Sequence, residues 1–188
     1  MRLERLCSSP LLFWESPMAF WIFKLNPKLY DLTERLADSN ATTTYKVTRY
    51  RKEITLGDTI FIMETGGRRS IRAVMRVEEG PRQMLELESE QRLYLCQRDT
   101  EVRWRVVCLL THRKVNLPVE DLKSVEGLEG LSIFHGWKQG TNFRVTESEG
   151  RLLLSLVERI VTDTEQSGAA SVSLSRGAIP QGNPNRGP

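Results

Sequence analysis

The stretch "KVTRYRKEITLGDTIFIMETGG", residues 46–67, joins a basic and aromatic segment to an apolar strand. Leu56-Gly57-Asp58 predicts a turn between them, because glycine and aspartate are common where a chain reverses. "TIFIM" (59–63) is an apolar run of strand length, and Gly66-Gly67 predicts a tight hairpin into "SIRAVMRV" (70–77). The stretch therefore predicts a core hairpin that follows a cationic segment.

The segments on either side of this hairpin also favour β-structure. "AFWIFKL" (19–25) is a strand rich in aromatic residues, and "TTYKV" (43–47) is a short strand. In "EVRWRVVCLLTH" (101–112) every second residue from Val102 to Leu110 is apolar. The alternation predicts a long strand with Arg103 and Arg105 on its solvent face.

Three helices are expected between and after the strands. "KLYDLTERLA" (28–37) has Leu29, Leu32 and Leu36 on one side at helical spacing. A short helix is expected near Pro118. Thr146 and Glu149 have the spacing of a capping box and precede an apolar stripe, which predicts a closing helix. Strands separated by tight turns, with small helices inserted, predict an α+β fold: a mixed pseudo-barrel of short strands with small flanking helices.

The chain has 188 residues, with 27 basic and 24 acidic side chains, and a net charge of +3. This length fits one domain, and so small a charge permits nucleic-acid binding without establishing it. Three cysteines without close spacing suit a reducing compartment, so we expect a cytoplasmic protein. No run of 18 apolar residues occurs, and no membrane partner is expected.

Both ends of the chain differ from the middle. We expect residues 1–17 to be a disordered extension, with Met18 as the true start, and residues 18–162 to form the domain. Residues 163–188 contain four Gly, three Pro and four Ser and no aromatic side chain. Such a segment buries too little apolar surface to offset its ordering entropy, which predicts a disordered tail.

Catalytic and metal signatures are missing from the sequence. His112 and His135 are the only histidines, and Cys108 lies four residues before His112. Zinc would need two further ligands, and no CxxC pair supplies them. Neither a G-x-S-x-G elbow nor a phosphate-binding G-x-x-x-x-G-K-[ST] loop is present. We therefore expect no catalytic residue, no metal and no cofactor.

Three clusters could instead bind a flat, negatively charged ligand. The first is Trp21, whose ring could stack on a base or could belong to a core strand. The second is Thr48-Arg49-Tyr50-Arg51-Lys52, either a binding surface for phosphates and rings or a solvated edge. The third is Gln139-Gly140-Thr141-Asn142, whose amides and hydroxyls could read a base edge or satisfy loop backbone groups.

The order of four segments resembles that of EVE domains, a branch of the PUA-like superfamily. The segments are "FWIFKLNPKLYDL", "VTRYRKEITLGDTIFI", "SIRAVMRVEEGP" and "QGTNFRVTESE". Each is a weak signal alone, but the set is specific, and it spans residues 18–160. The resemblance implies a small pseudo-barrel with helices, which agrees with the strand pattern.

The resemblance also implies recognition of a modified nucleotide without catalysis. EVE domains resemble readers that flip a modified base, mostly a modified cytosine in DNA, into a pocket, and they often work beside restriction nucleases. Here the pocket would include Trp21, Asn26, Thr48, Arg49 and Tyr50. The loop Gln139, Gly140, Thr141 and Asn142 would close it, and Arg51 and Lys52 would contact phosphates. The expected partners are a nucleic acid with a modified base and a nuclease or restriction protein.

Two other functions are compatible with the sequence. The first alternative is a PUA-like module that binds modified or structured RNA. The second is a small-molecule hydrolase, for which no catalytic signature exists.

Overall fold

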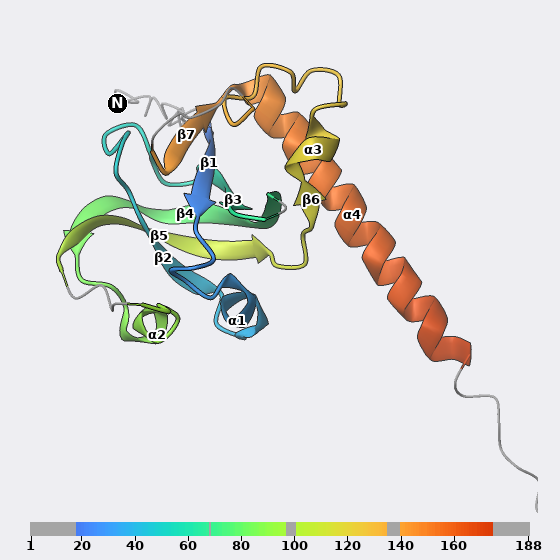
Figure 1. Cartoon of the computed structure of the whole chain (residues 1–188), viewed down its shortest axis with the longest axis horizontal. Coiled ribbons are helices and arrows are strands. Elements are labelled where there is room, and N and C mark those ends of the chain that lie inside the picture. The colour runs from blue at the N-terminus through green and yellow to red at the C-terminus, as the bar shows by residue number, and fades with distance from the viewer. Residues whose placement is uncertain (1–17, 68, 97–100, 135–139, 175–188) are drawn as a thin grey trace, which may run out of the picture.

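The computed structural model describes residues 18–67, 69–96, 101–134 and 140–174 (Figure 1). Residues 1–17, expected to be an extension, lie outside this described part. Within it, no helix has the length and apolarity needed to cross a membrane. The described side chains also contain no group of three or more His, Cys, Asp or Glu arranged to hold a metal ion.

A mixed, seven-stranded sheet forms the centre of the fold, which confirms the α+β class. Its strands are β1 (Phe20–Leu25), β2 (Thr42–Lys46), β3 (Thr59–Glu64), β4 (Ser70–Met84), β5 (Arg103–His112), β6 (Leu117–Pro118) and β7 (Asn142–Val145). The order is β2-β5-β4-β3-β1-β7, with β6 paired to the start of β4. Only β1 and β3 run parallel among these pairs. The sheet is not closed into a barrel, and β2 and β7 are its edges.

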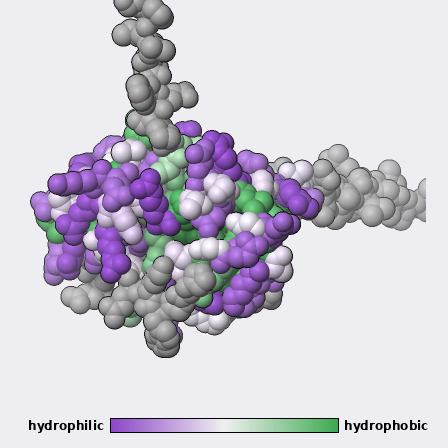
Figure 2. All heavy atoms as spheres, turned by 90° about the horizontal axis from the view of Figure 1, so that it is seen from above, coloured by the Kyte–Doolittle hydropathy of each residue, from purple (hydrophilic) through white to green (hydrophobic). Residues whose placement is uncertain are grey.

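The helices lie around this sheet. They are α1 (Leu32–Ala37), α2 (Glu88–Gln91), α3 (Val119–Leu122) and α4 (Glu147–Leu174). Figure 1 shows α3 and α4 together on one side, while α1 and α2 lie near the other end of the domain. Charged and polar residues cover most of the face seen in Figure 2, with hydrophobic surface confined to small areas between them.

The helix expected at 28–37 begins later than the leucine spacing predicted. Asp31 is the N-cap of α1, and its side chain accepts a hydrogen bond of 2.9 Å from the Glu34 backbone. The preceding residue, Tyr30, forms an isolated β-bridge with Tyr94. Leu29 therefore lies outside the helix and is 51% exposed. A local cap and a long-range bridge set this boundary.

The two faces of β1 belong to two different cores. Phe20 and Ile22 pack with Leu153 and other residues beneath α3 and α4. Trp21 and Phe23 point to the opposite face and pack inside the curve of the sheet. Because both faces are covered, the strand reads as a continuous apolar run rather than an alternating one.

The prediction that Arg105 faces solvent is wrong. Its side chain is completely buried and forms an ion pair with Glu86, which is also buried. The same carboxylate accepts hydrogen bonds from Tyr94 Oη, at 2.8 Å, and from Thr44 Oγ1. The segment after β4 supplies Glu86, and this coverage of the β5 face could not be read from the alternation within β5. Val102, expected in the core, precedes the strand and is 59% exposed.

The predicted capping box at the start of α4 is confirmed. The Glu149 backbone donates to Thr146 Oγ1 at 3.3 Å, and the Thr146 backbone donates to Glu149 Oε2 at 3.0 Å. Gly150 follows in the first turn, where a Cβ atom would lie 2.1 Å from Cγ of Phe20. Gly150 is therefore the position where the helix approaches β1 too closely for any side chain.

The predicted tail is helical over its first part, since α4 continues to Leu174. All three prolines of the predicted tail, and three of its four glycines, come after residue 174. The composition of residues 163–188 as a whole does not describe the first half of the segment, which contains no helix-breaking proline. Residues 175–188 lie outside the described part.

Replacing Gly150 with alanine tests this close approach. Alanine normally stabilises a helix relative to glycine by about 1 kcal/mol. Here we expect Gly150→Ala to lower the free energy of unfolding by about 1–3 kcal/mol, because the methyl group overpacks against Phe20. Chemical denaturation measures the change. Ser155→Ala, at an exposed position of the same helix, is the control, and a stabilised Gly150→Ala protein would contradict the packing described.

Candidate functional site

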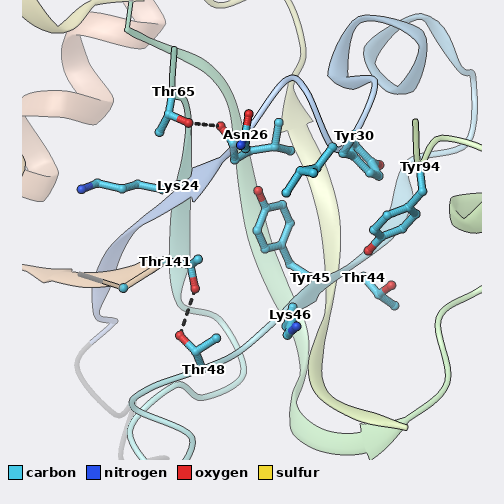
Figure 3. Close-up of a pocket in the computed structure, with 13 residues that line it drawn as sticks. Lys24, Asn26, Tyr30, Thr44, Tyr45, Lys46, Thr48, Thr65, Tyr94 and Thr141 are labelled. Atoms are coloured by element: carbon cyan, nitrogen blue, oxygen red, sulfur yellow. Dashed lines mark hydrogen bonds between the residues drawn. The ribbon is translucent and has the colours of Figure 1, made fainter. Parts of the chain in front are cut away.

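A cavity of about 460 Å³ opens between the ends of β1 and β2 and the loop before β7. Tyr30, Tyr45 and Tyr94 line one side of it. Figure 3 shows these tyrosines on the side toward α1, with Thr48 and Thr141 linked across the opposite part of the rim. The cavity therefore combines aromatic walls with a polar rim.

The cavity's shape depends on Asn142, which connects the two edges of the sheet. Asn142 is the first residue of β7 and is 1% exposed. Its Oδ1 accepts hydrogen bonds from the Thr48 backbone at 2.8 Å and from Thr48 Oγ1 at 3.0 Å. Its Nδ2 donates to the Lys46 carbonyl at 3.4 Å. The amide thus ties the end of β2 to the start of β7, and we call this set of bonds the Asn142 latch.

The latch brings two hydroxyl groups together at the rim. Thr48 Oγ1 and Thr141 Oγ1 are 2.9 Å apart and share a hydrogen bond. Gly140, the next rim residue, has a φ of +129° and lies against the Arg49 guanidinium, since a Cβ there would be 3.4 Å from Cζ. The rim therefore requires glycine at this position for its backbone conformation.

A buried polar network holds the aromatic wall. Tyr30 Oη donates to Glu90 Oε2 at 2.5 Å, and Glu90 also pairs with Arg35 at 2.9 Å. The Tyr30 and Tyr94 rings meet edge to face, with centroids 5.4 Å apart. Tyr94 is held in turn by its bond to the Glu86 carboxylate. Both rings are thus fixed by buried carboxylates, which restricts their motion.

Burial makes the tyrosines of the wall harder to ionise than free tyrosine. It raises the pKa of Tyr30, and the charge of Glu90 adds to that effect. Burial likewise raises the pKa of Tyr94, with Glu86 adding to it, and raises the pKa of Tyr45. Burial also lowers the pKa of Lys24 at the cavity edge, and the charge of Arg69 adds to this. The phenols remain neutral at physiological pH and present apolar faces to a ligand.

Four residues expected in the pocket do line this cavity: Asn26, Thr48, Gly140 and Thr141. Asn142 lies just behind them, but its amide is occupied by the latch, so it acts on the pocket through Thr48 and Lys46. Gln139 lies outside the described residues.

Trp21 does not offer a stacking surface. Its side chain is 0% exposed, and its Nε1 donates to Asp58 Oδ2 at 2.8 Å. The structural alternative, a core strand, therefore describes this residue, because both faces of β1 are covered. Tyr50 packs on it with ring centroids 5.3 Å apart and adopts a positive φ of 61°. Tyr50 is only half-buried and does not line the cavity.

The expected phosphate contacts lie beside the cavity rather than in it. Arg51 and Lys52 are both exposed. The Arg51 guanidinium lies 5.3 Å from the centre of the Trp104 ring, in a neighbouring groove. Arg49 is exposed and reaches the rim at Gly140. Arg49 is thus the cation of the opening sequence that reaches the cavity rim, and Arg51 lies in the groove next to it.

Sequence reasoning missed the aromatic wall. The chain has four tyrosines, and three of them, Tyr30, Tyr45 and Tyr94, line the cavity. Tyr30 fell in a predicted helix, Tyr45 in a predicted strand, and Tyr94 in a segment without a pattern. No spacing in the sequence joins them, because they meet only through the β-bridge and the pairing of β2 with β5.

The open mixed sheet, its short helices and the tyrosine-lined cavity define a small α+β domain. The chain belongs to the EVE domain family, whose model matches residues 19–156. Among curated proteins, no relative matches this sequence.

Solved structures share the fold at low sequence identity. The human THYN1 protein in complex with 5-methylcytosine-containing DNA is 18% identical and has a TM-score of 0.54, covering 74% of this chain and 98% of that one. Rpa0253 from Rhodopseudomonas palustris is 14% identical, with a TM-score of 0.55 and coverage of 75% and 94%. A hypothetical protein from Leishmania major is 15% identical, with a TM-score of 0.54 and coverage of 76% and 96%.

Replacing Asn142 tests the latch. Asn142→Ala leaves the Thr48 backbone N–H without its acceptor, so we expect the free energy of unfolding to fall by about 1–3 kcal/mol. Urea denaturation measures it. The control is Asn116→Ala, which removes the same amide from an exposed position. A folded Asn142→Ala protein with unchanged stability would show that the amide is not structural and would contradict the latch.

Proposed function

We propose that this EVE domain binds a modified nucleotide base, a modified cytosine in DNA, by receiving the flipped base in the tyrosine-lined cavity. The observation that carries the proposal is the cavity itself: a recess of about 460 Å³ with three tyrosine rings on one side and a hydrogen-bonding rim on the other. Its volume lies within the range of about 300–1,000 Å³ typical of small-molecule sites.

The chemistry of the walls suits a nucleobase. Neutral tyrosine rings can stack on any base, and such stacking contributes about 1–3 kcal/mol per base. Asn26, Thr48 and Thr141 place amide and hydroxyl groups at the rim, where they can both donate and accept hydrogen bonds. A methyl group buried against the rings adds about 0.8 kcal/mol, which favours a methylated base over an unmodified one.

A recessed site also explains why the base must leave the duplex. Unstacking and unpairing cost a few kcal/mol, and the cost is repaid by stacking, rim hydrogen bonds and phosphate contacts. Arg49 reaches the rim at Gly140 and Arg51 lines the neighbouring groove, and both side chains are exposed, so they can meet the phosphates next to a flipped nucleotide. The similarity in fold to a human protein in complex with 5-methylcytosine-containing DNA supports this choice of ligand.

The proposal assigns binding and not catalysis to this chain. Two of the three cavity tyrosines, Tyr30 and Tyr94, donate their hydroxyl protons to buried carboxylates. Cleavage of modified DNA would then require a separate nuclease, and a nuclease partner is part of the proposal.

Two leucine substitutions test the cavity. Tyr45 has no hydrogen bond that fixes its hydroxyl among the contacts described, and its ring packs on Phe23 at 5.4 Å. We expect Tyr45→Leu to weaken binding of a 5-methylcytosine duplex by about 5- to 150-fold, the loss of one stacked base. Tyr50→Leu, the matched control, removes a ring outside the cavity and should weaken it far less. Fluorescence anisotropy with a methylated and an unmethylated duplex of one sequence measures both.

Melting curves of both variants confirm that the comparison is made between folded proteins.

Equal binding by Tyr45→Leu and the parent would contradict the cavity as the base site, and selective loss in Tyr50→Leu would move the site to the surface around Tyr50. RNA carrying the same modified base serves as competitor. If it displaces the DNA at lower concentration than unlabelled DNA does, the alternative of an RNA-binding module replaces the DNA proposal.

A further inference from the structure

A second recess adjoins the cavity. It has a volume of about 450 Å³ and shares Lys46 and Thr48 with the cavity, so the two recesses lie next to each other at the end of β2. Its other polar and aromatic lining comes from Arg51, Gln83, Arg103 and Trp104. We call it the Trp104 groove.

We propose that the Trp104 groove binds the unpaired nucleotide next to the flipped base, with that nucleotide's base stacked on Trp104 and its phosphate held by Arg51 and Lys46. This inference rests on the proposed function only in taking the strand to be the DNA that carries the flipped, modified base. The groove by itself fits any single-stranded nucleic acid.

The charge of the groove fits a phosphodiester strand. Three cationic side chains, Lys46, Arg51 and Arg103, line it. Glu101 pairs with Arg103 and is the acidic group that borders this end of β5. Lys46 and Arg51 are exposed. The described side chains that line the groove include no Asp or Glu, so the local charge is positive although the whole chain carries only +3.

The indole of Trp104 fits a stacked base. It is half-buried and packs against the core formed inside the sheet, which fixes the ring. The Trp104 carbonyl accepts a hydrogen bond of 2.8 Å from the Val47 backbone, next to the shared residue Thr48. Arg51 lies 5.3 Å from the ring centre, an arrangement in which an arginine and an indole can enclose a base or in which the guanidinium can turn to a phosphate.

The adjacency of the two recesses determines what the groove should recognise. The groove shares Lys46 and Thr48 with the cavity, so a neighbouring nucleotide of the same strand reaches Trp104 only when it too is unpaired, as in single-stranded DNA. Stacking tolerates every base, since each has a π-face. The groove should therefore add affinity to methylated and unmethylated strands alike and leave the preference for the modified base unchanged.

Three variants and three probes test the inference. The variants are Trp104→Leu, which keeps apolar volume, Trp104→Phe, which keeps an aromatic ring, and Arg51→Gln. The control Arg159→Gln removes a charge at an exposed position on α4. The probes are the nucleoside 5-methyl-2′-deoxycytidine, a single-stranded trimer with 5-methylcytosine in the centre, and the same trimer unmethylated, each titrated at two salt concentrations.

We expect Trp104→Leu to weaken binding of both trimers by about 5- to 150-fold and to leave the affinity for the nucleoside as in the parent. Trp104→Phe should retain most of the trimer affinity. Arg51→Gln should lower the salt dependence by about one ion or less for each trimer, and Arg159→Gln should change nothing. Melting curves confirm folding.

The proposal that the groove binds a nucleotide would be overturned if Trp104→Leu left the affinity for both trimers unchanged. An equal loss of affinity for the trimers and for the nucleoside would also overturn it. The proposed function is judged separately, by whether the parent prefers the methylated over the unmethylated trimer. If the parent has no such preference, the modified-base proposal fails. The groove proposal is then tested by the effect of Trp104→Leu on the affinity for the unmethylated trimer. Failure of both trimers to bind the parent would overturn the groove.

Discussion

One buried amide, that of Asn142, holds together the two edges of an otherwise open sheet. Strands β2 and β7 have no backbone pairing with each other, and the latch to Thr48 and Lys46 provides a side-chain connection between them. The cavity lies beside this connection, and its rim residues Gly140 and Thr141 immediately precede the latch. A sheet that closed fully would leave no mouth, and a sheet without the latch would leave the rim unsupported. The cavity is thus a consequence of incomplete closure.

The polar rim and the aromatic wall of the cavity are stabilised in different ways. The rim depends on short contacts between hydroxyl and amide groups, which can exchange with those of a ligand. The aromatic wall depends on the buried carboxylates of Glu86 and Glu90, which are paired with Arg105 and Arg35. Removing one partner of such a pair would leave an uncompensated charge, so the wall tolerates little change. A fixed wall beside an adaptable rim is what selection for a flat ring requires.

The sequence predicts local features of this fold well and non-local features poorly. The turn at Gly57, the hairpin at Gly66-Gly67 and the Thr146 capping box follow from contacts between near neighbours, and all three are present. Burial of Arg105 depends on a partner from another segment, and no alternation within β5 could reveal it. The same holds for the pocket: its rim lies in loops with recognisable chemistry, whereas its tyrosines meet only through tertiary structure. Asn142 was found as a polar loop residue, but its role as a latch is set by strands far from it in sequence.

Entry of a modified base into the tyrosine-lined cavity can be measured directly, because the chain has only four tyrosines. Protein labelled with ¹³C only in its four tyrosine rings can be titrated with a 5-methylcytosine oligonucleotide and followed by NMR. If the base enters the cavity, we expect large shifts for Tyr30, Tyr45 and Tyr94, which line it, and a small shift for Tyr50, which packs on Trp21. Binding that shifts Tyr50 strongly and leaves the three cavity rings unchanged would contradict entry into the cavity.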